Sequence, residues 1–383
     1  MASGQTILIL GGGIAGVVLA RRLRRRLGKK HRVALVEKKP QHEYPPGYNR
    51  LALDVSPLVA MRIAYLRNRG IDVVHSEVLK IDPTNRQVRV TIRELGFDHL
   101  VIALGADLGT ETVSGWGRNA HHTYSADEAD RLRRDLKDFK GGTVVIGTAA
   151  LPYKCPPAPY EFAFLFEEYC RKKGLREATT FHLFSPEPEP LAFAGESVSG
   201  ALKGWLEERH ITYHPESKLT GISGPTHEIT FEGEKKLNYD FLYAVPPHRA
   251  PQVCVDSQLT GESGWISVNP ETLETKWDGV YAIGDVAEVI SSNGRRVPMT
   301  GAFAMKQADV VSKNLVAKIE GRTPPAAFDG KAGCELMVGG GRAAQIEADI
   351  FSGSGTFKMS SPSYLTQWKK LRREKMWVWD WFE

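Results

Sequence analysis

The sequence has no apolar run long enough to cross a bilayer. A spanning helix needs about 20 consecutive apolar residues, and no stretch of the 383 residues reaches that length. A conventional membrane span is therefore excluded, while attachment to a membrane surface stays open. The residues ahead of the first strand-like segment also lack the pattern of a secretory signal, which predicts a cytoplasmic protein.

Cysteine is scarce as well. The chain has 4 cysteines, and their spacing is not that of a metal site, so no bound metal is expected. Such a set suits a redox pair better than a disulfide framework. Cys170 and Cys254 have no motif around them, and we interpret both as structural.

The composition is otherwise that of a folded protein with several domains. Hydrophobic residues make up 42% of the chain and charged residues 25%, which argues against disorder. At 383 residues the chain is long enough for two or three domains. The net charge of +5 is mild, and we interpret the basic cluster in residues 21–30 as a solvated helix face, with no nucleic acid expected as a partner.

The first segment has the pattern of a dinucleotide-binding unit. An apolar strand over 6–10 is followed by a glycine-rich turn and a helix from Val17 to Leu27. The first glycine permits the tight turn, the second lets the backbone approach a pyrophosphate, and the third lets the helix pack closely on the strand. A second strand then ends in an acidic residue, about 20 residues on, where ribose hydroxyls bind; this favours FAD or NAD over NADP. The residues predicted to bind the dinucleotide are Gly11, Gly13, Ile14, Ala15, Gly16, Glu37 and Lys38.

A second strand-helix unit starts near residue 120, and its glycine loop has been lost. The strand over 143–147 is followed by Ala149 and Pro152 at the positions of the second and third glycines. A side chain at the second position blocks a pyrophosphate, and proline at the third cannot pack as glycine does. We therefore do not expect NADH to bind.

Cys155 follows this degenerate loop, within the proline-rich segment 153–161. Three prolines stiffen the segment, and the residues after it predict a helix that begins near Pro159. The positive amino end of that helix, together with Lys154, is expected to favour the thiolate of Cys155. A small buried cysteine in a turn is the alternative interpretation.

The segment around Cys155 resembles a known redox site. A cysteine followed by a Pro/Gly-rich turn and then Tyr160-Glu161 is similar to the first redox cysteine of sulfide:quinone oxidoreductases and of the flavoprotein of flavocytochrome c sulfide dehydrogenase. In both families this cysteine pairs with a distant second one, and Cys334 stands where the second is expected. Residues 97–106, 277–285 and the start of a helix near 298 resemble further FAD-binding segments of such flavoproteins. The FAD-binding residues implied there are Ala103, Gly105, Gly284, Asp285 and Gly301.

The resemblance implies an α/β fold with two Rossmann-like dinucleotide-binding domains. An FAD domain over 1–115 and 245–325 is interrupted by a second, degenerate domain over 116–244, and a C-terminal interface and membrane-attachment segment spans 326–383. No cysteine precedes Cys155, so FAD is expected to be bound non-covalently.

The chain ends in a basic and aromatic stretch, 364–382, which contains four tryptophans. Large aromatic side chains beside Lys and Arg suit the headgroup region of an anionic bilayer, so we predict an interfacial anchor. An oligomer contact, or a helix packed on its own domain, is the alternative. Together with the resemblance, this predicts a peripheral, monotopic protein on the cytoplasmic face of the cell membrane, and a homo-oligomer stays open.

The resemblance implies a sulfide:quinone oxidoreductase. Sulfide would attack a disulfide of Cys155 and Cys334, or a sulfur-bridged form of it, yielding sulfane sulfur or polysulfide, and electrons would pass through FAD to a membrane quinone. Glu161 matches the family glutamate and is the candidate for handling protons, unless it is a surface or capping residue. Three other functions stay open: a flavocytochrome c-type sulfide dehydrogenase with a cytochrome acceptor, a type II NADH dehydrogenase, and a non-catalytic redox-sensing flavoprotein.

Overall fold

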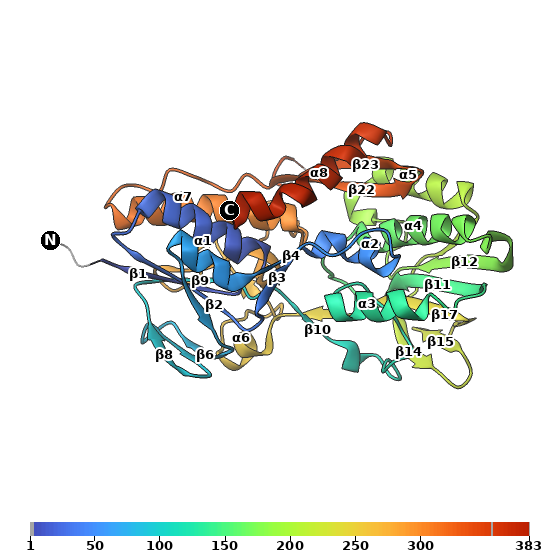
Figure 1. The fold of residues 1–383 in the computed structure, drawn as a ribbon, viewed down its shortest axis with the longest axis horizontal. Helices are drawn as coiled ribbons and strands as arrows, with labels where there is room; N and C mark the ends of the chain where they lie inside the picture. The colour runs from blue at the N-terminus through green and yellow to red at the C-terminus, as the bar shows by residue number, and fades with distance from the viewer. Residues whose placement is uncertain (1–3, 354, 383) are drawn as a thin grey trace.

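The computed structural model describes residues 4–353 and 355–382, which form two α/β units and a C-terminal extension (Figure 1). Residues 1–3, part of the amino end from which no signal segment was expected, lie outside this range. The first unit is built on a five-stranded parallel sheet with the order β20-β9-β1-β2-β5. Its strands are β1 (Thr6–Leu10), β2 (Arg32–Glu37), β5 (Asp72–His75), β9 (His99–Ile102) and β20 (Val280–Ala282).

Two long helices pack side by side on this sheet (Figure 1). They are α1 (Ile14–Leu27) and α7 (Gly301–Ile319). The helix α1 begins three residues before the predicted Val17, so its amino end lies directly at the glycine-rich turn. The predicted strand over 6–10 is confirmed as β1, whose residues from Ile7 onward are fully buried.

The basic cluster in residues 21–30 is only partly a solvated face. Arg25, Lys29 and Lys30 are exposed, as predicted, whereas other arginines of α1 contact the rest of the fold. Arg21 is buried, Arg22 pairs with Asp309 of α7 at 3.0 Å, and Arg26 Nη1 donates to Ser312 Oγ at 2.8 Å. The interpretation considered α1 alone, whereas α7, from far along the chain, packs against the same side of it.

The second unit is built on a four-stranded parallel sheet with the order β13-β12-β11-β17. Its strands are β11 (Gly142–Thr148), β12 (Thr179–Phe184), β13 (Ile211–His214) and β17 (Phe241–Val245), and its helices are α3 (Ala126–Asp135), α4 (Ala158–Lys172) and α5 (Glu196–Glu208). A hairpin of β15 (Glu228–Phe231) and β16 (Lys236–Asn238) joins β14 (Leu219–Ser223) in a separate antiparallel sheet. Cys170 lies in the core of this unit and Cys254 in that of the first, which confirms both as structural.

Shorter elements complete the two units. The two segments that connect the units pair with each other as the antiparallel strands β10 and β18, so the chain crosses and returns at one place. The bounds of the shorter elements are β3 (Gln41–Glu43), β4 (Ala60–Arg62), β6 (Val78–Asp82), β7 (Gln87–Val90), β8 (Arg93–Gly96), β10 (Asp107–Leu108), β18 (His248–Arg249), β19 (Ile266–Ser267), β21 (Ala287–Glu288), α2 (Tyr48–Ala52) and α6 (Gln252–Asp256).

The C-terminal extension lies across both units (Figure 1). It consists of an antiparallel sheet of β22 (Lys331–Gly339), β23 (Arg342–Asp349) and β24 (Thr356–Met359), followed by the helix α8 (Tyr364–Trp381). The helix α8 contacts β22 and β23 at one end and α1 at the other. Within 4–353 and 355–382, no helix combines the length and the hydropathy that crossing a membrane requires.

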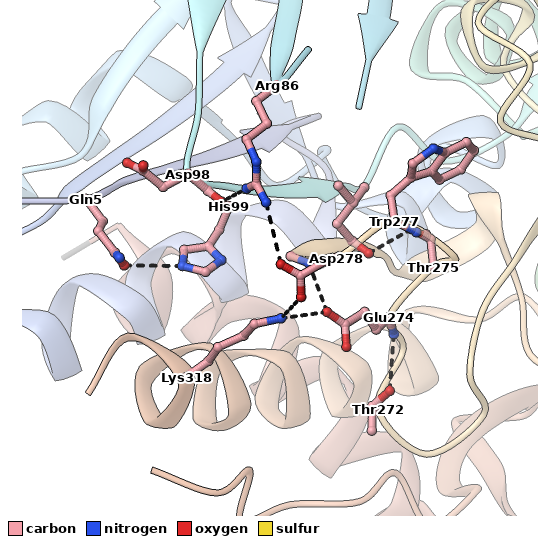
Figure 2. Close-up of polar contacts among 12 residues, drawn as sticks. Gln5, Arg86, Asp98, His99, Thr272, Glu274, Thr275, Trp277, Asp278 and Lys318 are labelled. Carbon is pink, nitrogen blue, oxygen red and sulfur yellow. Dashed lines mark hydrogen bonds and ion pairs between the residues drawn. The ribbon is translucent and has the colours of Figure 1, made fainter. Parts of the chain in front are cut away.

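An ion-pair network anchors the turn that leads into β20 (Figure 2). Lys318 of α7 contacts Glu274 at 2.9 Å and Asp278 at 2.6 Å, and Arg86 approaches the other carboxylate oxygen of Asp278 at 3.5 Å. The strand β20 then runs toward Asp285, one of the predicted FAD-binding residues. The network therefore fixes one end of the strand whose other end delivers a candidate cofactor residue.

Candidate functional site

A single large cavity collects nearly all of the predicted site residues. Its volume is about 620 Å³, within the range of small-molecule sites, and its walls come from both units and from the C-terminal extension. Gly16 is the one predicted residue that does not line it. The predicted residues that do line it are Gly11, Gly13, Ile14, Ala15, Glu37, Lys38, Ala103, Gly105, Cys155, Glu161, Gly284, Asp285, Gly301 and Cys334.

The turn between β1 and α1 has the shape that a dinucleotide requires. Gly11 has φ +102°, which only glycine adopts readily, and a Cβ on Gly16 would lie 1.9 Å from the carbonyl oxygen of Gly11. A Cβ on Gly13, in contrast, would meet no atom within 4 Å, so the backbone there is open to the cavity. The side chain of Glu37 holds the turn, because its Oε2 accepts from the N–H of Gly12 at 2.5 Å. An open backbone at the amino end of a helix fits a bound pyrophosphate.

Cys155 lies on the loop between β11 and α4 in a strained backbone conformation. Its φ is +53°, a left-handed value that is uncommon for a residue other than glycine and that concentrates at functional sites. The N–H of Cys155 donates to the carbonyl of Met299 at 2.7 Å, and its own carbonyl accepts from the N–H of Ala158 at 2.8 Å. These two bonds hold the residue in place while its side chain is exposed to the cavity.

Cys334 lies on β22 and lines the same cavity as Cys155, and both are thiols in the structure. Although Cys155 faces the open cavity, desolvation by the surrounding cavity walls raises its pKa to about 11, with the nearby carboxylate of Glu161 adding to the effect. Burial also raises the pKa of Cys334 to about 12, and the neighbouring Cys155 adds to it. Lys154 lowers the pKa of Cys155, as predicted, but desolvation and Glu161 outweigh the lysine, so the expected thiolate is not favoured. That the two cysteines act as a catalytic pair stays a prediction.

The second unit departs from the first at the corresponding turn. In the first unit β1 ends at Leu10 and α1 begins at Ile14, whereas β11 ends at Thr148 and α4 begins only at Ala158. The intervening loop carries Cys155 in place of a phosphate-binding turn, and Ala149 within it is fully buried. The amino end of α4 is thus displaced from the end of its strand, which supports the expectation that NADH does not bind here.

The sequence and the fold both match known proteins. Residues 5–308 match the sequence model of the family described as pyridine nucleotide-disulphide oxidoreductase. The chain belongs to this family. Membership implies a flavin cofactor, and the open glycine turn, the Glu37 carboxylate at the end of β2 and the cavity beside them fit a flavin dinucleotide.

Two curated relatives of this family member are similar over most of its length. The mitochondrial sulfide:quinone oxidoreductase of Mus musculus is 27% identical over 359 residues, which cover 90% of this chain and 78% of the relative. The corresponding protein of Dictyostelium discoideum is 26% identical over 354 residues, 87% of this chain and 75% of the relative. The crystal structure of the sulfide:quinone oxidoreductase from Aquifex aeolicus superposes with a TM-score of 0.89 at 21% identity, covering 98% of this chain and 91% of that one, so the two share a fold.

The helix α8 supplies residues that sequence analysis did not place at the site. Lys370 forms an ion pair with Glu161 and donates to the carbonyl of Glu335 at 3.0 Å. The same carboxylate oxygen of Glu161 accepts from the N–H of Met337 at 2.9 Å, and Arg373 contacts the carboxylate of Glu335 at 2.6 and 2.8 Å. Glu161 therefore joins α4, β22 and α8 at the wall of the cavity, whereas its role in handling protons stays a prediction.

The tryptophans of α8 divide between its two faces. Trp377 is buried and Trp381 packs against the core of the first unit, which agrees with the alternative of a helix packed on its own domain. Trp368 and Trp379 remain 58% and 61% exposed. The inner residues recur at the spacing of one helical face, so sorting the stretch by helical period would have separated a packed face from an exposed one. The inner residues that line the cavity are Lys370, Arg373, Glu374 and Trp377.

Proposed function

We propose that this protein is an FAD-dependent sulfide:quinone oxidoreductase. The observation that carries the proposal is that Cys155 and Cys334, distant in sequence, line one cavity together with the glycine turn of a dinucleotide-binding unit. The relatives named sulfide:quinone oxidoreductases, which match most of this chain, support the same assignment.

We propose that FAD binds non-covalently in the domain formed by residues 1–115 and 245–325. The turn after β1 would hold the pyrophosphate, Glu37 would lie at the ribose end, and Asp285 and Gly301 would lie nearer the flavin. When bound, FAD supplies two-electron transfer between the sulfur site and the quinone. The degenerate domain, 116–244, and the extension, 326–383, then contribute one cysteine each.

Atoms and electrons balance in the reaction proposed for the two cysteines. Hydrosulfide attacks a disulfide of Cys155 and Cys334, so that one sulfur-sulfur bond breaks, a persulfide forms on one cysteine and a thiolate on the other. Closing a sulfur bridge between persulfide and thiolate then releases one proton and two electrons. These electrons would pass through a bound FAD to a quinone. Glu161, whose carboxylate raises the pKa of both thiols, is the candidate for removing the proton.

We also propose that the outer face of α8 binds a membrane surface. Besides the two exposed tryptophans, Tyr364 and Leu365 are exposed, and Arg372 lies 5.8 Å over the ring of Trp368. Aromatic and basic side chains together suit a bilayer interface, and we propose a peripheral position on the cytoplasmic face of the cell membrane. Because inner residues of α8 line the cavity, a quinone would reach the flavin from that side.

Anaerobic addition of sulfide to the purified protein tests the proposal. We expect sulfide, and not NADH, to bleach the flavin absorbance, and a short-chain quinone to restore it. Cys334→Ser should abolish bleaching by sulfide, whereas Cys170→Ala, a change in the core of the second unit, should not. Bleaching by NADH at catalytic rates, or normal bleaching in Cys334→Ser, would refute the assignment. Reoxidation by a cytochrome but not by a quinone would favour the flavocytochrome c-type alternative.

A further inference from the structure

His42 is buried between the glycine turn and α8. Its Nδ1 lies 2.8 Å from the carbonyl oxygen of Gly12, and its Nε2 lies 2.8 Å from Nε1 of Trp377. The indole nitrogen can only donate, so Nε2 of His42 must accept. The proton of the neutral ring therefore resides on Nδ1, which donates to Gly12. Burial lowers the pKa of His42, which agrees with a neutral ring.

The peptide groups of Gly12 are consequently held from two sides. Its N–H donates to Glu37 Oε2 at 2.5 Å, and its carbonyl accepts from His42 at 2.8 Å. Gly12 lies between Gly11 and Gly13, which line the cavity where the pyrophosphate would bind. Losing either bond would free the peptide groups of Gly12 to rotate, and this would disturb the backbone of Gly11 and Gly13, where the pyrophosphate would bind.

Trp377, the partner of His42, is one of the buried residues of α8. The indole of Trp377 stacks on the His42 ring with centroids 5.7 Å apart and lies 4.8 Å from the ring of Tyr44. One turn earlier, Glu374 pairs with the buried Arg50. The inner face of α8 is thus connected through a single histidine to the backbone of the glycine turn.

We propose that His42 and Trp377 are positioning residues for the cofactor, and that the docking of α8 through them sets the affinity of the glycine turn for FAD. The proposal rests on the FAD binding proposed above. Because coupling between two sites is reciprocal, bound FAD must also stabilise the docked position of α8. The helix that carries the exposed tryptophans on its outer face is then linked to cofactor retention through its inner face.

Trp377→Phe tests the link, because it keeps an aromatic ring and removes the N–H donor. We expect FAD to bind the reconstituted variant about 2- to 10-fold more weakly, the range of one neutral hydrogen bond, as measured by flavin fluorescence. Trp116→Phe, the same change at a buried site in the second unit, is the matched control and should leave FAD affinity unchanged. Equal FAD affinity in Trp377→Phe and the unmodified protein, or equal weakening in Trp116→Phe, would overturn the proposal.

A second set of variants separates positioning from general loss of stability. His42→Asn can still donate to Gly12 but cannot reach Trp377, whereas His42→Phe can do neither. FAD affinity should therefore be lower in His42→Asn than in the unmodified protein, and lowest in His42→Phe. Combining His42→Asn with Trp377→Phe should weaken FAD no more than either change alone, because both remove the same bond. Additive losses would show that the two side chains act separately and would refute the link.

Proteolysis of α8 gives a readout that does not depend on activity. Its exposed lysines and arginines make it a trypsin substrate, and FAD should slow the cleavage in the unmodified protein but not in Trp377→Phe. Equal protection by FAD in both proteins would contradict the coupling. Should the unmodified protein fail to bind FAD at all, the proposed function itself fails, which is a different outcome from any of these.

Discussion

The buried ion pair between Lys370 and Glu161 lies at the wall of the cavity, and its removal should have a measurable effect on both stability and thiol reactivity. Their side chains are only 11% and 7% exposed, so Lys370→Met leaves a buried carboxylate without its cation. Breaking a buried pair in this way typically costs about 3–5 kcal/mol. The N–H of Met337 still donates to Glu161, so we expect a loss near the lower end, about 3 kcal/mol of the free energy of unfolding.

The double variant distinguishes the pair from its individual residues. In Glu161→Gln with Lys370→Met, the amide oxygen of Gln can keep the bond from Met337, and no buried charge is left unpaired. We therefore expect the double variant to regain at least about 2 kcal/mol relative to Lys370→Met, since each single change leaves its partner uncompensated. Urea unfolding of the four proteins, followed by circular dichroism, gives the coupling energy.

The same variants shift the reactivity of the thiols. Lys370 lowers the pKa of both Cys155 and Cys334, and Glu161 raises the pKa of both. Alkylation of the reduced protein should therefore require a higher pH in Lys370→Met and a lower pH in Glu161→Gln. Two results together would refute the buried ion pair. They are a loss of unfolding free energy in Lys370→Met no larger than the roughly 1 kcal/mol of a surface pair, and an unchanged pH profile of alkylation.

Three further substitutions test the electrostatics elsewhere. Burial raises the carboxyl pKa of Glu187 to about 7. The group therefore stabilises the fold at low pH, and this stabilisation is lost as the pH rises through about 7. In Glu187→Gln, the decline in unfolding free energy between about pH 4 and pH 8 should be smaller by up to about 3 kcal/mol. Arg50→Met should cost about 3–5 kcal/mol in urea unfolding, because Arg50 and Glu374 are 2% and 6% exposed. Lys318→Met should cost at most about 1 kcal/mol, because Lys318 is partly exposed and its partner Asp278 largely so; equal costs for the two would contradict this ranking.

The parts of the fold that depend on neighbouring residues could be predicted from the sequence. The strand over 6–10 and the glycine turn after it are specified locally, by an apolar run and by backbone that only glycine permits, and the structure confirms β1 with the predicted bounds. The helix beginning near Pro159 is also specified by neighbouring residues, and the structure confirms it as α4. The start of α1 was placed too late, because Ile14 and Ala15 were assigned to the turn although their backbone is already helical.

The contacts made between distant segments could not be predicted. Arg22 and Arg26 of α1 look solvated until α7 packs against them, and Lys370 looks like part of a basic membrane-binding face until α8 folds back on Glu161. His42 gave no signal at all, because a histidine on a three-residue strand becomes informative only when Gly12 and Trp377 lie on either side of it.

The thiol pKa values decide which species is the nucleophile in the proposed reaction. A reduced pair with pKa values of about 11 and 12 is almost wholly protonated at neutral pH, so neither cysteine is a competent nucleophile at rest. We therefore expect hydrosulfide to be the attacking species, and the cysteines to meet it in the oxidised, electrophilic form. A leaving thiolate of high pKa departs slowly, so the two lysines that lower the pKa of Cys155, Lys370 and Lys154, act on the departure of the leaving group. The cations near the pair therefore matter for the breaking of the sulfur-sulfur bond, rather than for activating a resting thiol.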